Sequence, residues 1–159
     1  MNQASDPWIA AAREVADLAF SDMRECIAGA PPDALNWRPR ADETNSIAVL
    51  AVHSLASTRS WLAVALGAPR PERDRPSEFV ATAADAAALL AFVDEMAAHC
   101  TRLFAAAADI DWNAERKTSA RPGDKLERVQ AAWALMHAME HLREHVGQML
   151  LTRQLADAR

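Results

Sequence analysis

Three of the five histidines lie in one short stretch near the end of the sequence, at His137, His141 and His145. On an α-helix, residues four positions apart advance by only about 40° around the axis, so the three imidazoles would project from one side. Neutral imidazole is a ligand of zinc, nickel and related divalent ions, and two histidines at this spacing can bind one ion. The spacing therefore predicts a metal site on this helix.

A helical wheel of this segment separates the three histidines from one another. The core-facing stripe is formed by large apolar residues, namely Leu135, Met139, Leu142 and Val146. His141 and His145 fall on the shoulder of that stripe among alanines, which leave room beside the rings. His137 points further toward the edge that carries Glu140 and Glu144, where we expect solvated carboxylates. We therefore expect His141 and His145 to be ligands and His137 to be their neighbour.

A third ligand is expected, because a catalytic metal site usually has three protein ligands and leaves one position for water or substrate. His53 is the best candidate, since it lies in the middle of a second apolar segment. His99, on a third predicted helix, is the alternative. The hypothesis is a site for a divalent transition metal at His53, His141 and His145, with zinc or nickel as the first candidates.

Four long segments have the composition of helices, and turn residues bound each of them. They run from Pro7 to Ala28, from the cap candidates Thr44, Asn45 and Ser46 to Leu66, from Thr82 to Ala108, and from Lys125 to Leu155. Asp6 is the expected N-cap of the first, and Thr82 with Asp85 resembles a capping box. Arg70 to Glu78 is a charged loop, and its run Arg73 to Glu78 is expected to be solvated or paired within itself. Asp109 to Asp124 forms a polar connection.

The chain has 159 residues, the size of one ordinary domain, and we expect a single domain over residues 1–159. Hydrophobic residues make up 51% of it, many of them alanine, while there are 4 glycines and no tyrosine. This composition favours helix over sheet and predicts an all-α four-helix bundle. These patterns alone do not determine how the four helices are connected within the bundle.

The formal net charge of -5 gives no electrostatic reason to bind a phosphate backbone, so no nucleic-acid partner is expected. Apolar stretches such as Ile47 to Leu55 fall short of the roughly 20 residues of a membrane span. Met1 to Asp6 lack the features of a signal peptide, which favours the cytoplasm. Cys26 and Cys100 lie on different predicted helices, and we expect both to be buried thiols.

Three segments of the sequence, in this order and spacing, resemble the DinB-like superfamily of metal-binding four-helix bundles, which includes the DinB and YfiT-like proteins. The first is Leu35 to Pro39 followed by Asn45 to Ala48 and His53, the second is Arg73 to Phe79, and the third is His141 to Gln148. One departure is Val146, which stands where many relatives have arginine. The likeness extends over nearly the whole chain.

The resemblance implies an up-down-down-up bundle with a long crossover between the second and third long helices. It also implies metal ligands at His53, His141 and His145, and a homodimer. Similar proteins include S-transferases that use mycothiol or bacillithiol, so a metal-dependent thiol S-transferase or hydrolase with a low-molecular-weight thiol as cosubstrate is one expectation. The alternative is a metal-stabilised binding or stress-associated bundle without turnover. No catalytic residue is assigned.

Overall fold

The computed structural model describes residues 6–118, 120 and 125–159 of the chain. It is mostly helical, with 68% of residues in helices, which confirms the predicted helical class. The elements in chain order are α1 (Pro7–Ile27), α2 (Pro32–Asn36), the 3-10 turn η1 (Ala41–Glu43), α3 (Ile47–Leu66), α4 (Arg75–Glu78), α5 (Ala86–Ala106), β1 (Glu115–Lys117), β2 (Arg128–Gln130) and α6 (Ala131–Asp157).

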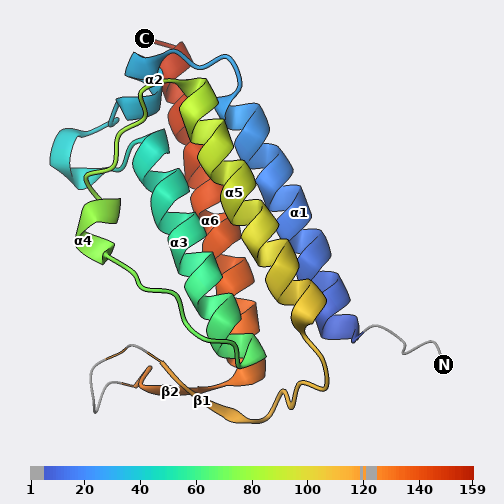
Figure 1. Ribbon diagram of the computed structural model, residues 1–159. Coiled ribbons are helices and arrows are strands. Elements are labelled where there is room, and N and C mark those ends of the chain that lie inside the picture. The colour runs from blue at the N-terminus through green and yellow to red at the C-terminus, as the bar shows by residue number, and fades with distance from the viewer. Residues whose placement is uncertain (1–5, 119, 121–124) are drawn as a thin grey trace.

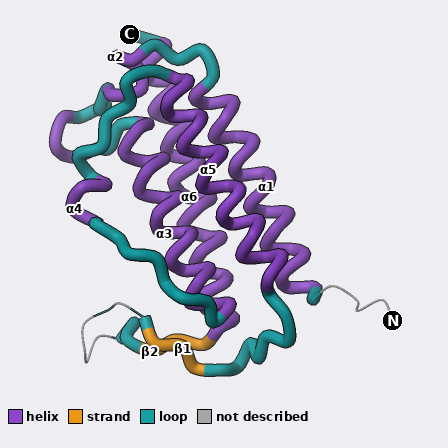
Figure 2. Tube along the Cα trace, in the orientation of Figure 1, coloured by secondary structure: helices purple, strands orange, loops and turns teal. Residues whose placement is uncertain are grey.

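The four long helices α1, α3, α5 and α6 lie side by side and enclose one core (Figure 1; Figure 2). Helix α3 contacts α5 and α6, and α1 contacts the same two helices. Each long helix contributes large side chains that are almost fully buried, among them Phe20, Met23, Leu55, Leu62, Val93, Leu142 and Met149. The bundle therefore holds α3 and α6 against each other, which matters because these two helices carry the histidines of interest.

Several helix ends follow directly from the residues that the sequence places there. Asp6 caps α1 by accepting hydrogen bonds from the backbone N–H groups of Trp8 and Ile9, at 2.8 and 3.3 Å. Ser46, one of the three cap candidates, caps α3 by accepting from the Val49 N–H at 3.2 Å. Gly67 ends α3 with a φ of 69°, a left-handed conformation that glycine adopts without strain. These predicted ends are confirmed.

The starts of the third and fourth long helices were predicted wrongly. Helix α5 begins at Ala86, because Asp85 and not Thr82 is its cap, and the Asp85 side chain accepts from the Ala88 N–H at 2.8 Å. Helix α6 begins at Ala131 and not at Lys125, because the residues before it form strand β2. Of the predicted polar connection, residues 119 and 121–124 lie outside the described part of the chain.

A small two-stranded sheet connects the ends of α5 and α6. Strands β1 and β2 pair antiparallel, and the central residues of the pair are Arg116 and Val129. An ion pair between Arg128 and Glu115, at 2.6 Å, joins the two strands on an exposed surface. The pairing fixes the chain immediately before α6 and so sets where that helix begins.

The connection between α3 and α5 runs back along the bundle and includes the short helix α4 (Figure 1). It is attached at its far end to α2, because Asn36 donates to the Ala83 carbonyl and accepts from the Ala83 N–H, both at 2.8 Å. Arg38 also donates to the carbonyl of Phe79 at 2.8 Å. These bonds attach the end of the connection to α2 and to the segment that follows α2.

Helix α3 is the one helix among the described residues that is long and apolar enough to cross a membrane by length and composition. The helix reaches Leu66 as predicted, but its apolar part is longer than the stretch Ile47 to Leu55, because the helix has 20 residues and its most apolar window has a mean hydropathy of 1.3. However, 72% of its apolar window is buried inside the bundle, which is typical of a core helix.

Candidate metal centre

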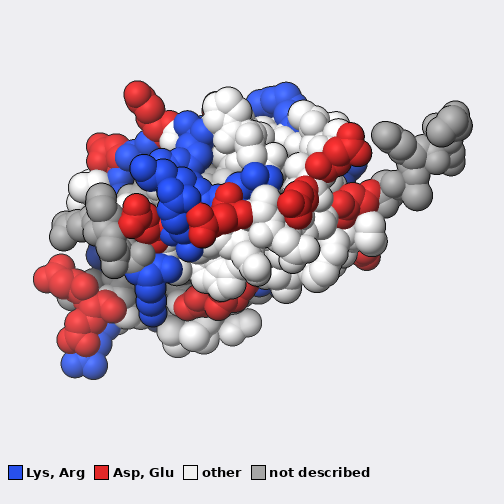
Figure 3. Space-filling model, turned by 90° about the horizontal axis from the view of Figure 1, so that it is seen from below, with Lys and Arg blue, Asp and Glu red and all other residues white. Residues whose placement is uncertain are grey.

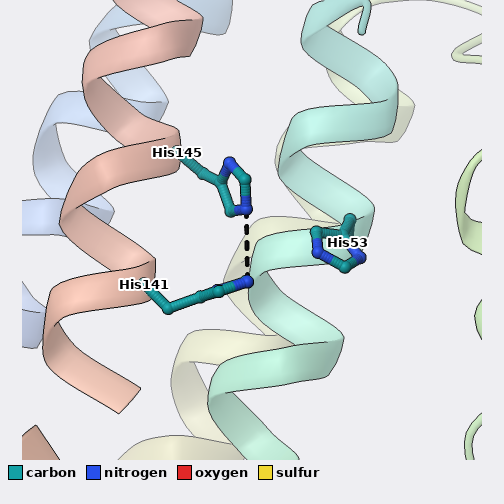
Figure 4. A group of neighbouring side chains, drawn as sticks. All are labelled: His53, His141 and His145. Atoms are coloured by element: carbon teal, nitrogen blue, oxygen red, sulfur yellow. Dashed lines mark hydrogen bonds between the residues drawn. The ribbon is translucent and has the colours of Figure 1, made fainter. Parts of the chain in front are cut away.

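Three histidine side chains converge on the space between α3 and α6 (Figure 4). His53 comes from the middle of α3, and His141 and His145 come from successive turns of α6. Each offers one ring nitrogen, and these atoms all lie within 4.8 Å of one another. The i, i+4 spacing on α6 and the direct packing of α3 on α6 together produce the group.

The distances within the group fit the geometry of a transition-metal site. The Nε2 atoms of His141 and His145 are 3.2 Å apart. Two nitrogens bound to one tetrahedral zinc ion at 2.0–2.1 Å would be about 3.3–3.4 Å apart. The ring centre of His53 lies 5.2 Å from that of His141 and 5.1 Å from that of His145. Nitrogens this close share either a proton or a cation, so the group could bind a metal ion.

A buried carboxylate fixes the orientation of His53. The Oε2 atom of Glu78 lies 2.8 Å from His53 Nδ1, and Glu78 is only 4% exposed. Arg73 donates to both oxygens of Glu78, at 2.6 and 2.8 Å, so this carboxyl group acts as a hydrogen-bond acceptor. His53 therefore carries its proton on Nδ1, and its Nε2 lone pair is available to a metal ion.

The two histidines of α6 are oriented differently from each other. His145 Nδ1 donates to Gln148 Oε1 at 2.8 Å, and Gln148 Nε2 in turn donates to Glu144 at 3.3 Å. His141 Nδ1 is buried and has no hydrogen-bond partner among the described residues. Packing on the helix and the contact with His145 therefore orient His141, whereas a chain of two hydrogen bonds orients His145.

The surroundings of His141 and His53 favour the neutral form of imidazole, which is the form that binds metals. Burial, assisted by the neighbouring His145 and His53, lowers the pKa of His141 to about 3. Burial also lowers the pKa of His53, although the hydrogen bond and the charge of Glu78 oppose that shift. Neutral rings at physiological pH are ready to coordinate a cation without first losing a proton.

The other two histidines lie outside this group. His137 stacks on Trp133, with ring centres 4.8 Å apart, and meets the edge of Trp61 at 4.7 Å. Its Nδ1 is 3.2 Å from Glu140 at the surface. Trp133 is 40% exposed, so it does not serve core packing. His99, the alternative third ligand, lies on α5 and is not a member of the group that contains His53.

Glu78 is the site residue that sequence reasoning missed. The run Arg73 to Glu78 was expected to be solvated or paired within itself, and the pairing of Arg73 with Glu78 is confirmed. The expectation of solvation was wrong for Glu78, because α4 turns its carboxylate inward beneath His53. An available signal was Asp74 followed by Pro76, a typical helix start, since Asp74 caps α4.

A cavity of about 930 Å³ opens beside the histidines, within the range of small-molecule sites. Its lining comes from α3, from α6, from the connection between α3 and α5, and from the segment around strands β1 and β2. Its lining includes His53, Ser57, Ser60, Trp61, Val64, Arg70, Pro71, Glu72, Arg73, Arg75, Thr118, Ala120, Leu126, His137 and His141. A small molecule in this cleft would lie next to two of the three grouped imidazoles.

Comparison with known proteins gives a family match and a structural match. A family model described as the DinB superfamily matches residues 16–149. A crystal structure described as the conserved protein of a locus from Enterococcus faecalis superposes with a TM-score of 0.71 and 17% sequence identity. The match covers 94% of this chain and 97% of that one, which shows a shared fold. No curated protein matches the sequence.

Proposed function

The chain belongs to the DinB superfamily, and from this premise we propose that it binds one divalent transition-metal ion, zinc or nickel, at His53, His141 and His145. The observation that carries the proposal is the convergence of three imidazole nitrogens within 4.8 Å. Imidazole suits zinc and nickel better than magnesium or calcium, which prefer oxygen ligands. The family is itself associated with metals, which supports the same assignment.

The chain's own groups would prepare the site in three ways. Helices α3 and α6 hold the rings at a fixed separation, Glu78 orients His53, and burial keeps His141 neutral. Three protein ligands leave at least one coordination position for a further ligand. When bound, such an ion supplies Lewis acidity that lowers the pKa of a thiol or water.

We extend the proposal to an enzyme of the thiol S-transferase or hydrolase type. The thiol would come from a small cosubstrate, because the chain's own thiols are sequestered. Cys26 and Cys100 are buried as predicted, and burial raises their pKa to about 11 and about 12. The cavity of about 930 Å³ beside His53 and His141 supports a small-molecule substrate.

A metal-stabilised binding or stress-associated bundle without turnover is the second candidate, and one observation favours it. Among the described residues that line the cleft, Glu72 is the one carboxylate. Glu78 is already engaged by Arg73 and His53, and Glu140 and Glu144 are exposed, as predicted from the helical wheel. Glu72, which is exposed, is therefore the one carboxylate of the described lining that could act as a general acid or base.

Metal analysis of protein purified without a nickel column tests the proposal. We expect about one zinc or nickel ion per chain, and we expect His53→Ala to remove it. His99→Ala is the matched control and should keep the ion. Full occupancy after His53→Ala would refute the three-histidine site.

A cobalt-substituted sample then separates the two candidate functions. A small thiol that binds at the open position would change the visible spectrum of the cobalt ion, which supports the enzyme. A spectrum that thiols leave unchanged would favour the binding protein.

The remaining features of the proposal concern the whole molecule. We assign one domain over residues 1–159, the up-down-down-up order that the colours of Figure 1 support, and a cytoplasmic protein without nucleic-acid or membrane partners. We also propose a homodimer, supported by large apolar side chains exposed on α6, namely Trp133, Met136, Leu151 and Leu155. Light scattering of the purified chain tests the dimer directly.

A further inference from the structure

The connection between α3 and α5 brings positive charge to the cleft beside the histidines. Arg70, Arg73 and Arg75 line this side of the cavity, and Glu72 is the one acidic residue among the described lining residues. The protein as a whole is acidic, with a formal net charge of -5. The cleft therefore has the opposite sign from the rest of the molecule.

The three arginines are not equally available to a ligand. Arg73 is neutralised by Glu78, to which it donates two hydrogen bonds at 2.6 and 2.8 Å. Arg70 and Arg75 form no ion pair with any carboxylate in the part of the chain that the structure describes, and both are exposed. The guanidinium of Arg75 lies over the ring of Phe79, 5.8 Å from its centre, which limits its positions without neutralising it.

The opposite side of the cleft has a different character. Trp61, Val64 and His137 line it, and the Trp61 and His137 rings meet edge to face with their centres 4.7 Å apart. These residues form an aromatic and apolar patch that adjoins His141, while Ser57 and Ser60 add hydroxyl groups to the same part of the lining. A ligand that fits the cleft would thus meet guanidinium groups on one side and aromatic rings on the other.

A wider view of the surface supports this distribution. Figure 3 shows one end of the molecule, where basic side chains gather in a group that acidic side chains flank on several sides. The connection with the cleft arginines leaves α3 at this end of the bundle (Figure 1). A concave region of one sign on an acidic protein concentrates ligands of the opposite charge.

We infer that the cleft binds a small organic anion, whose carboxylate is held by Arg70 and Arg75 while its less polar part lies against Trp61. The guanidinium group is planar and matches a carboxylate with two parallel hydrogen bonds. The other end of the bound molecule would point toward His53 and His141. Only this last point rests on the proposed function, because the two arginines would bind the carboxylate whether or not a metal ion is present.

The inference is tested with two thiols that differ in one charge, 3-mercaptopropionate and its methyl ester. Both are titrated into the full-length cobalt-substituted protein, and the visible spectrum is followed. We expect the acid to reach half saturation at a concentration at least about tenfold lower than the ester, the usual effect of a charged hydrogen bond. In Arg70→Gln combined with Arg75→Gln, this preference should vanish while the affinity for the ester stays the same.

Arg102→Gln is the matched control, since Arg102 is an exposed arginine of α5 that does not line the cleft. It should keep the full preference for the acid. Equal affinity for acid and ester in the unchanged protein would overturn the inference, as would a preference that survives the double substitution. Circular dichroism of the double variant shows whether it is folded, and both substituted side chains are exposed.

A failure of the proposed function can be told apart from a failure of this inference. If the protein binds no cobalt, or if thiols leave the cobalt spectrum unchanged, the proposed chemistry fails. The same acid and ester are then compared by calorimetry on the protein as purified. A preference for the acid that depends on Arg70 and Arg75 would uphold the anion site in that case, and no preference would overturn it.

Discussion

Two cavities lined by described residues have the same size, about 930 Å³ each, but differ in the residues that line them. The first lies between the start of α1 and the end of α5, where Ile9, Leu18 and Phe104 mix with charged residues. The second lies beside the three-histidine group. We refer to them as the α1–α5 cavity and the histidine cleft.

The charged contacts of the α1–α5 cavity are mostly local, and the exception is the Asp6 carboxylate, which also accepts from the indole N–H of Trp112. Arg13 pairs with Asp17 one turn away on α1 at 3.8 Å, with both side chains more than half exposed, and such pairs contribute little to stability. Asp6 serves as a helix cap. In the histidine cleft, by contrast, side chains from different elements point at one another across buried space. Volume alone therefore does not mark a candidate site, whereas the convergence of desolvated polar groups does.

The largest expected difference between the two cavities concerns metal content. His145→Ala or His141→Ala removes one of three nitrogens, and we expect metal content to fall from about one ion per chain to nearly none. Asp17→Asn, in the α1–α5 cavity, should leave it unchanged. Elemental analysis of the purified variants measures their metal content. Metal loss in Asp17→Asn would contradict the distinction between the two cavities.

Glu78→Gln should produce the next largest effect. Glutamine keeps the size of the side chain and can still accept from His53 Nδ1, but the negative charge behind the imidazole is lost. We expect zinc affinity to fall by about 10- to 100-fold, the usual cost of losing such an outer partner. Competition with a chromophoric chelator measures it.

Glu14→Gln is the matched control for this substitution, since Glu14 lines the α1–α5 cavity. Zinc affinity should stay unchanged in that variant. If Glu78→Gln also binds zinc as tightly as the unchanged chain, the charge of Glu78 does not contribute to the zinc affinity of the site.

The pH dependence of stability should distinguish the histidine cleft in the metal-free protein. His141 has a pKa of about 3 in the folded chain against an ordinary value of 6.5, so it is neutral when folded and takes a proton more readily when unfolded. Its contribution is complete above pH 6.5 and declines as pH falls. We expect the free energy of unfolding to drop between pH 6.5 and 5 by up to about 1.4 kcal/mol per pH unit.

Urea unfolding at several pH values measures this slope, and His141→Asn should flatten it. Asp17→Asn, from the α1–α5 cavity, should leave the slope as it is. A slope that His141→Asn does not change would assign the pH dependence to other groups.

The smallest expected effect comes from Asp6 in the α1–α5 cavity. Its carboxylate accepts from the Trp8 N–H and from the indole N–H of Trp112, each at 2.8 Å. Asp6→Ala should lower the free energy of unfolding by about 1 kcal/mol, as for other lost helix caps. The urea midpoint would fall while zinc affinity stays the same, and a weaker zinc site would contradict the separation of the two cavities.

The sequence predicted those parts of the structure that depend on local chemistry. Asp6, Ser46 and Gly67 bound their helices because caps and left-handed turns depend on a few adjacent residues. His141 and His145 share a face because helical periodicity puts them there. More than one residue can satisfy the same local rule. Asp85 rather than Thr82 caps α5, although both residues fit the capping pattern.

What the sequence did not predict depends on contacts between distant segments. Glu78 meets His53 across 25 residues, and only the path of the connection along α3 brings them together. Strand β2 replaces the first turn of the predicted last helix because it pairs with β1, and neither three-residue strand has a recognisable pattern of its own. The cleft arginines were likewise recognised only as part of a charged loop, because their sequence does not reveal which cavity they line.

The placement of His53 on α3 and of the other two histidines on α6 also bears on the unfolded chain. An ion held by these side chains would join points roughly 90 residues apart and close a long loop, as a disulfide does. In the chain-entropy description, a permanent link of that length removes about 4.5 kcal/mol of freedom from the unfolded ensemble. The metal ion would thus act as a reversible cross-link, which a chelator removes when it takes up the ion.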